Sequence, residues 1–258
     1  MDRPQGGGPR DAHGDRPCRR RHRDHLPGGR RRRLAGLNQV VQALGLGLDP
    51  AWRRRTPQER CEDLRDLQRA LQVQPEVQTF TYTSIGLQAG TDLLLWSLAP
   101  SLEALEERSA AVLRCGLGGW SRVSESLLGI IQGSQYVKRP TAQEQSLFKG
   151  ERSRYLVVYP FTKSAEWYLL DKETRQRVMN EHMKVGHSYP KVRQLLANSF
   201  GVDDMDFLVA YETDDLAEFG NLVRELRGTE SRRSTVRDTP ILTAVHRDFD
   251  DLTRLLGA

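Results

Sequence analysis

Residues 155–237 read YLVVYPFTKSAEWYLLDKETRQRVMNEHMKVGHSYPKVRQLLANSFGVDDMDFLVAYETDDLAEFGNLVRELRGTESRRSTVR, and they carry the clearest pattern of secondary structure in the chain. Its short apolar runs have the length and composition of strands, at 155–159, 192–200 and 207–212. Two longer segments repeat apolar residues at helical spacing, at 171–185 and 216–227. Strands and helices therefore share one segment of the chain, which predicts a mixed sheet-and-helix unit.

The chain before this stretch has a similar order of elements. Helical spacing recurs at 49–71 and 101–115, and strand patterns occur at 77–87, 92–98 and 124–131, with a last strand at 240–245. Thr56, followed by Pro57, is the expected cap of the first helix, and Ser101 the cap of the second. The economical interpretation is an α+β fold of two tandem modules, each an antiparallel sheet with helices on one face.

Composition divides the chain into four segments, namely a tail at 1–35, an N-terminal module at 36–139, a connector at 140–152 and a C-terminal module at 153–258. Residues 1–33 hold 11 arginines and 4 aspartates, a net charge of +7, while the whole chain carries +5. The remainder is therefore slightly acidic. The tail has few large apolar residues, so we expect it to be disordered, and we expect no nucleic-acid partner.

No apolar segment of a secretory signal follows the arginines, and no run of about 18 apolar residues could span a membrane. The three cysteines, Cys18, Cys61 and Cys115, are far apart and form no CxxC pair, so their spacing predicts no zinc site. We expect reduced thiols and a cytoplasmic protein without a membrane span.

One histidine is placed to hold a metal. On the expected helix at 171–185, His182 falls one turn after Val178 and three residues before Val185, so it shares their apolar face. His187 belongs to another face or to the turn. A buried neutral imidazole can coordinate haem iron. The helix alone favours a core histidine that is hydrogen-bonded to a backbone carbonyl.

Several motifs occur in a set order, namely YPFTK, EWYLL, EHMKVGHSYP, NSFGVDDMDFLVAYETDD and LVRELRGTESRR. Together they resemble the C-terminal half of the chlorite dismutase superfamily, which includes chlorite dismutases and coproheme decarboxylases. The resemblance extends more weakly through DPAW, DLLLWSLAPSLEALE and SQYV, and it covers about 38–247. Residues 38–48, NQVVQALGLGL, lack the aromatic-rich first strand of the family, which puts that strand in question.

The resemblance implies two ferredoxin-like modules joined into one α+β barrel, haem in the C-terminal module, and a homo-oligomer, commonly a ring of five. His182 matches the proximal histidine that binds the haem iron. Tyr159 matches the tyrosine of the decarboxylases' YPM motif, which relays oxidation to a propionate, although Phe161 replaces the methionine here. Lys163 matches a lysine near a propionate, and Tyr136 a tyrosine near the haem edge. Without the resemblance, these three would be taken as strand, surface and core residues.

The strand at 192–200 discriminates between the family's enzymes. Chlorite dismutases carry a distal arginine there, whereas many decarboxylases carry glutamine, and the matching position is Gln194. Successive strand side chains point to opposite faces, so Gln194 and Arg193 cannot both face the haem. Glu230 is a weak candidate for a carboxylate that orients His182.

The resemblance therefore implies a coproheme decarboxylase. Such an enzyme uses hydrogen peroxide to convert propionates 2 and 4 of coproheme into vinyl groups, which gives protohaem. Gln194 would be its distal residue and Tyr159 its relay. Two alternatives stay open, namely a chlorite dismutase and a haem-binding member of the family without turnover.

Overall fold

The computed structural model of the chain describes residues 39–132 and 151–258. The expected tail, most of the expected connector and Tyr136 lie outside the described residues.

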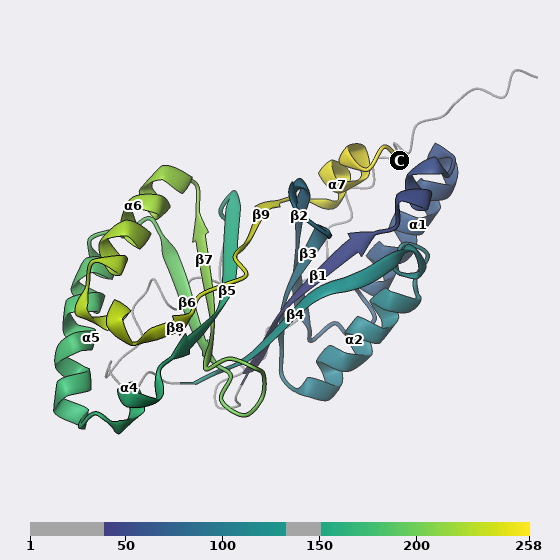
Figure 1. The fold of residues 1–258 in the computed structure, drawn as a ribbon. Coiled ribbons are helices and arrows are strands. Elements are labelled where there is room, and N and C mark those ends of the chain that lie inside the picture. The colour runs from purple at the N-terminus through teal and green to yellow at the C-terminus, as the bar shows by residue number, and fades with distance from the viewer. Residues whose placement is uncertain (1–38, 133–150) are drawn as a thin grey trace, which may run out of the picture.

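Eight antiparallel strands close into one barrel (Figure 1). They are β1 (Gln39–Leu48), β2 (Gln78–Gln88), β3 (Thr91–Ala99), β4 (Ser121–Ile131), β5 (Tyr155–Lys163), β6 (Arg193–Asn198), β7 (Phe207–Thr213) and β9 (Leu242–His246). The order around the barrel is β7-β6-β4-β1-β3-β2-β9-β5, and pairing of β5 with β7 closes it. A short strand, β8 (Thr235–Arg237), pairs with β5. The two halves of the chain therefore share one sheet.

Helices cover the barrel on two opposite sides (Figure 1). In the N-terminal half they are α1 (Pro57–Ala70) and α2 (Leu102–Arg114), and in the C-terminal half α4 (Ala165–Leu169), α5 (Lys172–His187) and α6 (Leu216–Arg227). The last helix, α7 (Phe249–Leu255), returns to contact α1. Short 3-10 helices occur at η1 (Pro50–Arg54), η2 (Gly118–Trp120) and η4 (Glu230–Ser234). The expected α+β barrel is confirmed.

The predicted helix caps are also confirmed. Thr56 caps α1 by accepting a hydrogen bond from the backbone nitrogen of Glu59, and the Glu59 side chain accepts one in return from the Thr56 backbone. Ser101 caps α2 through the backbone nitrogen of Ala104. Such caps satisfy N–H groups that the first helical turn leaves unpaired.

The doubt about the first strand was wrong, because β1 is a strand of the barrel wall and pairs with β3 on one edge and with β4 on the other. A strand with neighbours on both edges and buried on both faces needs a continuous apolar run rather than aromatic residues. Its glycines permit close approach. A Cβ on Gly45 would lie 2.8 Å from the Ser124 hydroxyl, and one on Gly47 would lie 2.3 Å from the carbonyl oxygen of Gly90.

Strand alternation separates two apolar layers in the C-terminal half. One layer fills the barrel interior and draws on all eight of its strands, with Leu156 and Val158 contributed by β5. The other layer lies between the sheet and helices α5 and α6. We call it the helix-facing cluster, and its members are Val157, Tyr159, Phe161, Val185, Tyr189, Val192, Phe207, Val209, Tyr211, Phe219, Leu222 and Leu226.

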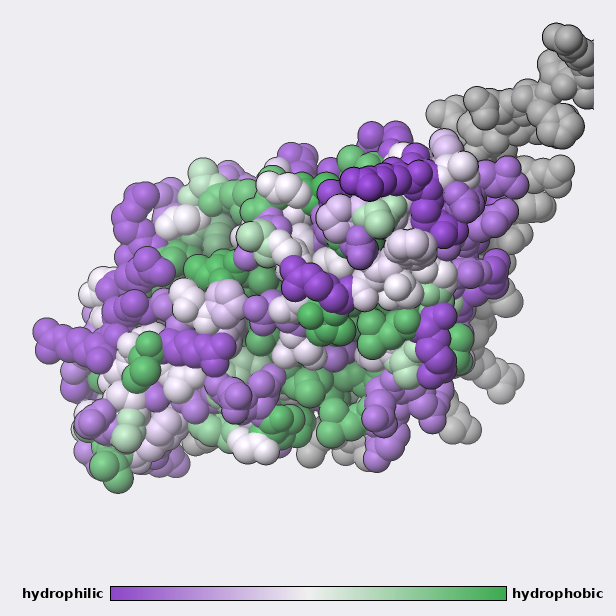
Figure 2. All heavy atoms as spheres, turned by 45° about the vertical axis from the view of Figure 1, so that its right-hand side comes forward, coloured by the Kyte–Doolittle hydropathy of each residue, from purple (hydrophilic) through white to green (hydrophobic). Residues whose placement is uncertain are grey.

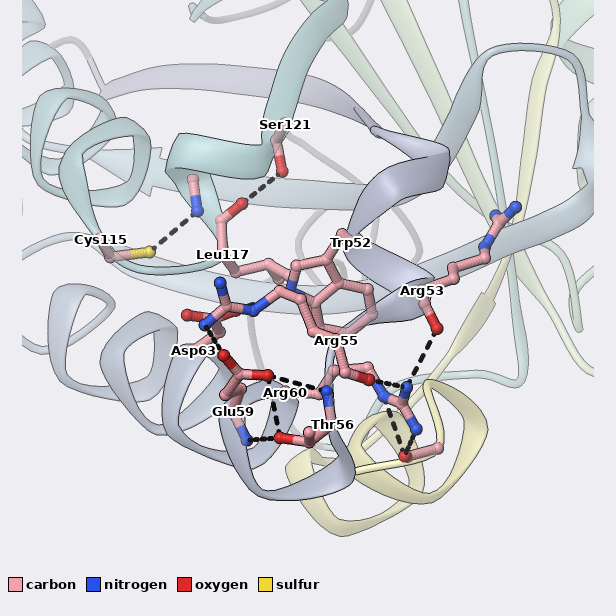
Figure 3. Close-up of polar contacts among 12 residues, drawn as sticks. Trp52, Arg53, Arg55, Thr56, Glu59, Arg60, Asp63, Cys115, Leu117 and Ser121 are labelled. Carbon is pink, nitrogen blue, oxygen red and sulfur yellow. Dashed lines mark hydrogen bonds and ion pairs between the residues drawn. The ribbon is translucent and has the colours of Figure 1, made fainter.

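A group of polar side chains around η1 and α1, in the N-terminal half, forms hydrogen bonds and ion pairs with one another (Figure 3). The indole nitrogen of Trp52 donates to Asp63 at 2.7 Å, and the Arg55 guanidinium lies 3.1 Å from the same carboxylate. Arg55 also lies over the ring of Trp120, 5.1 Å from its centroid. We call Trp52, Arg55 and Asp63 the Asp63 cluster.

Two of the three cysteines lie among the described residues. Cys115 is free, and burial raises the pKa of its thiol. Cys61 is buried on α1.

Hydrophobic groups emerge between hydrophilic ones on the face drawn in Figure 2. Among the described residues, no helix is long and apolar enough to cross a membrane.

Candidate functional site

The helix-facing cluster lies between strands β5, β6 and β7 and helices α5 and α6, and we call this layer, with the side chains at its margin, the compartment. His182 lies on α5, three residues before Val185, which belongs to the cluster. The side chain of His182 is half-buried, whereas His187, at the end of the same helix, is exposed. Of these two histidines, the structure therefore brings His182 to the compartment.

Ser231 connects His182 to Lys163. The hydroxyl of Ser231, on η4, lies 3.2 Å from Nδ1 of His182, and its backbone carbonyl accepts a hydrogen bond of 2.7 Å from Nζ of Lys163. Lys163, the last residue of β5, is buried, and its ammonium lies 4.7 Å from the ring centroid of Trp167. We call His182, Lys163 and Ser231 the His182 cluster.

Burial decides the protonation of this cluster. Burial, and to a lesser extent the positive charge of Lys163, lower the pKa of His182 to about 4 against a smaller opposing effect of Glu181, so the imidazole is neutral near pH 7. Burial also lowers the pKa of Lys163 to about 8, with a smaller contribution from Arg232. With Nδ1 facing Ser231, the unprotonated Nε2 of the matching tautomer is the nitrogen that can bind a metal.

Glu230, the weak candidate for orienting His182, points elsewhere. Its carboxylate pairs with the Arg177 guanidinium at 2.8 Å, and the next residue, Ser231, contacts the imidazole instead. No sequence pattern marks Ser231, because a single serine next to Glu230 carries no periodicity or motif of its own.

Tyr159 faces the same compartment from β5. Its ring is stacked on that of Tyr211, with centroids 6.1 Å apart and planes at 26°. Burial, a hydrogen bond to Tyr211 and the nearby Asp238 carboxylate raise its pKa well above the ordinary value of 10.0, against the opposing effect of Arg227. The Tyr159 phenol is therefore fully protonated near neutral pH.

The register of β6 places Gln194 and Arg193 on opposite faces. Gln194 pairs with Tyr211 across β6 and β7, and Tyr211 belongs to the helix-facing cluster, so Gln194 faces the compartment. Arg193 points the other way, where its guanidinium lies 2.7 Å from the Glu212 carboxylate and 2.8 Å from the Ser153 hydroxyl. Arg193 is thus held in an ion pair away from His182.

A cavity of about 180 Å³ adjoins Tyr159, and its lining includes Phe219 and the ion pair of Arg227 with Asp238 at 3.5 Å. This volume is below the roughly 300 Å³ of a typical ligand site. The same sheet face continues past the cavity at β6, where Leu196 is 51% exposed. Apolar surface without full cover is therefore present beside the cavity.

The side chains of this site fit a metal ion that is already bound by a macrocycle such as a porphyrin. Among residues 39–132 and 151–258, no group of three or more His, Cys, Asp or Glu side chains could hold an ion. A bare ion needs several protein ligands, whereas haem iron takes four nitrogens from its porphyrin and needs one axial side chain. A neutral imidazole above an apolar sheet face meets that need.

Comparison with known proteins gives a consistent picture. The family model described as "Chlorite dismutase" matches residues 58–247. A coproheme decarboxylase from Mycolicibacterium smegmatis is 32% identical over 176 residues, which is 66% of this chain and 74% of that protein.

Solved structures agree with the family model. A chlorite dismutase from Candidatus Nitrospira defluvii, in complex with imidazole, superposes with a TM-score of 0.77 at 26% identity, and the match covers 85% of this chain and 95% of that one. A putative chlorite dismutase gives a TM-score of 0.73 at 25% identity, with 86% and 100% covered. With a family model that spans most of its length and a relative above 30% identity, this chain belongs to the chlorite dismutase family.

Proposed function

We propose that this protein is a coproheme decarboxylase, which uses hydrogen peroxide to convert propionates 2 and 4 of coproheme into vinyl groups and so yields protohaem. The observation that carries the proposal is the register of β6, which directs Gln194 toward the compartment of Tyr159 and directs Arg193 into an ion pair with Glu212. The relative from Mycolicibacterium smegmatis, named a coproheme decarboxylase, supports it.

In this proposal, His182 binds the iron through Nε2, since its neutral imidazole has Nδ1 engaged by Ser231. The bound haem would supply the redox chemistry, and the protein supplies orientation and electrostatics. Lys163 is proposed, on the family pattern, as the cation near a propionate, and its ammonium also donates to the Ser231 carbonyl. Tyr136, outside the described residues, is proposed as a contact at the haem edge on the family pattern alone.

Tyr159 is proposed as the relay to the propionates. Its phenol keeps its proton near neutral pH, and it lines a cavity that also contains the Arg227 guanidinium, a group suited to bind a carboxylate. Gln194 would face the opposite part of the compartment as a neutral amide. We further propose that the protein forms a homo-oligomer, a ring of five as the family resemblance implies.

The second candidate is a chlorite dismutase, which the family's solved structures favour. That reaction needs a cation to hold an anionic oxygen species above the iron. Arg193 could meet the need only by leaving Glu212, whose carboxylate is fully buried and also accepts a hydrogen bond from Tyr82 at 2.6 Å. Glu212 would keep its ion pair with Arg152 at 3.3 Å, but Arg193 lies on the opposite face of β6 from Gln194 and would reach the compartment only with a shift of register, which argues against this candidate.

The test is to load the protein with ferric coproheme, add hydrogen peroxide and weigh the porphyrin product by mass spectrometry. Wild type should yield the lighter protohaem. Tyr159→Phe should bind coproheme normally but fail to decarboxylate it, because the substitution keeps the ring and removes the hydroxyl. A wild-type protein that leaves the mass unchanged and evolves oxygen from chlorite would establish the second candidate instead.

A further inference from the structure

The short helix η4, which carries Ser231, is not capped by its own N-cap residue. That residue, Thr229, makes no side-chain hydrogen bond to the backbone of η4. Its hydroxyl donates instead to the carbonyl of Leu226, in the last turn of α6. A helix start leaves N–H groups that need a partner. The first N–H of η4 therefore depends on an acceptor from another element or from solvent.

The structure supplies that acceptor from α5. The carboxylate of Glu181 accepts a hydrogen bond of 2.9 Å from the backbone nitrogen of Glu230, the first residue of η4. Arg177, one turn earlier on α5, donates to the Glu230 carboxylate at 2.8 Å. The helix α5 therefore holds both the backbone and the side chain of Glu230.

This attachment lies next to the His182 cluster along both elements. Glu181 directly precedes His182 on α5. On η4, Glu230 directly precedes Ser231, whose carbonyl accepts the hydrogen bond of 2.7 Å from Nζ of Lys163. The two-residue segment is thus fixed at its first N–H and at its last carbonyl. In this position the Ser231 hydroxyl lies 3.2 Å from Nδ1 of His182.

We propose that Glu181 is a positioning residue for His182, which caps η4 and so fixes Ser231 beside the imidazole. The inference rests on the proposed function, in which His182 binds the iron. The Glu181 side chain is exposed, and exposed charges interact weakly across water. A hydrogen bond that caps a helix start keeps its effect at the surface, and its loss destabilises that turn. Glu181 therefore acts as a hydrogen-bond acceptor rather than as a charge.

The direct test needs no haem and separates the acceptor from the charge. Glu181→Gln keeps an oxygen that can accept from the Glu230 backbone but removes the charge, whereas Glu181→Ala removes both. The ¹⁵N resonances of the His182 imidazole report its tautomer and its hydrogen bond, and their loss in His182→Ala assigns them. They should move in Glu181→Ala and stay close to the wild-type position in Glu181→Gln. Unmoved resonances in Glu181→Ala, or equal movement in both Glu181 variants, would overturn the proposal.

The second measurement uses ferric haem and reads its affinity by titration at the Soret band. Glu181→Ala should weaken binding about three- to tenfold, no more than the loss of the Ser231 hydroxyl itself. The double variant Glu181→Ala/Ser231→Ala should bind no more weakly than Ser231→Ala alone, because Glu181 acts through Ser231. Unchanged affinity in Glu181→Ala, or losses that multiply in the double variant, overturn the proposal. A wild-type protein that binds haem but does not decarboxylate coproheme refutes the proposed function instead, and both measurements on Glu181 still stand.

Discussion

The Asp63 cluster and the His182 cluster are both partly buried polar groups beside a helix, yet their charges are arranged differently. In the Asp63 cluster, the Asp63 carboxylate accepts a hydrogen bond of 2.7 Å from the Trp52 indole nitrogen and lies 3.1 Å from the Arg55 guanidinium (Figure 3). A negative group thus lies between two donors. All of its strong interactions are made inside the protein.

The His182 cluster brings together two groups that can both be positively charged. His182 and Lys163 contact Ser231 from two sides, and the Lys163 ammonium otherwise faces the rings of Phe161 and Trp167. Among the described residues, no carboxylate is hydrogen-bonded to either side chain, and the neighbouring Glu181 carboxylate acts on the His182 pKa less strongly than burial and Lys163 do. Each group responds with a lowered pKa, to about 4 for His182 and about 8 for Lys163.

The difference indicates which cluster holds the fold and which serves chemistry. A satisfied buried ion pair is costly to break, so the Asp63 cluster should matter for stability. A desolvated imidazole with a perturbed pKa is typical of a functional site, so the His182 cluster should matter for binding. Substitutions in each cluster should therefore affect different measurements.

The largest expected effect on stability follows Asp63→Ala. The substitution leaves the Trp52 indole and the Arg55 guanidinium without their carboxylate, and the free energy of unfolding should fall by about 3–5 kcal/mol in urea denaturation. Asp66→Ala is the control, because Asp66 is a more exposed residue of the same helix, paired with Arg69. It should cost less than about 1 kcal/mol. Equal losses in both variants would remove the distinction between the clusters.

His182→Ala should weaken haem binding by roughly a hundredfold or more, because it removes the side chain that is proposed to bind the iron. His187→Ala should bind haem as wild type does, since His187 is exposed at the end of α5. Titration followed at the haem Soret band measures both affinities. Equal loss of the band in the two variants would contradict the assignment of His182.

The pH dependence of stability should carry the signature of His182. Its pKa is about 4 in the folded protein and 6.5 as the ordinary value. Between pH 4 and pH 6.5, His182 is protonated in the unfolded chain but not in the folded protein. The stability that is present above pH 6.5 is therefore lost as the pH falls toward 4. The haem-free wild type should lose about 2–3 kcal/mol from this group, and His182→Ala should lack that loss. If the free energy of unfolding depends on pH in the same way in wild type and His182→Ala between pH 7 and pH 4, the pKa of His182 is not lowered.

Local signals predicted most of the fold. Thr56 and Ser101 mark helix starts because a capping side chain acts within three residues, and the α6 boundaries, 216–227, follow from apolar spacing and a cap. The strand β1 was not predicted, because its glycine-rich sequence fits a strand only through close contacts with β3 and β4, which are distant in sequence. Closure of the barrel depends on pairings of the same distant kind.

The candidate site was predictable in part. Periodicity placed His182 on the apolar face of its helix, but Ser231 could not be found, since it matters only through a partner on another element. For Lys163 the structure gives a buried contact with a backbone carbonyl, which no sequence pattern records. The faces of Gln194 and Arg193 needed the register of β6 with β7, because an error of one residue exchanges them.

The smallest expected effect follows Ser231→Ala, which tests how His182 is held rather than whether it binds. An imidazole that binds iron through Nε2 carries its proton on Nδ1, and that N–H would donate to the Ser231 hydroxyl 3.2 Å away. Loss of such a partner typically weakens a metal site by about tenfold, and a single neutral hydroxyl should lie at that lower end.

The contact of Lys163 should survive this substitution, because its acceptor is the backbone carbonyl of Ser231. Unfolding should therefore change little, while haem affinity falls and the reduction potential of the bound iron shifts. Ser234→Ala, in the same 3-10 helix, is the control, and it should leave both the affinity and the potential unchanged. If Ser231→Ala binds haem with unchanged affinity and potential, the hydroxyl does not orient the imidazole. The functional character of the His182 cluster would then rest on burial alone.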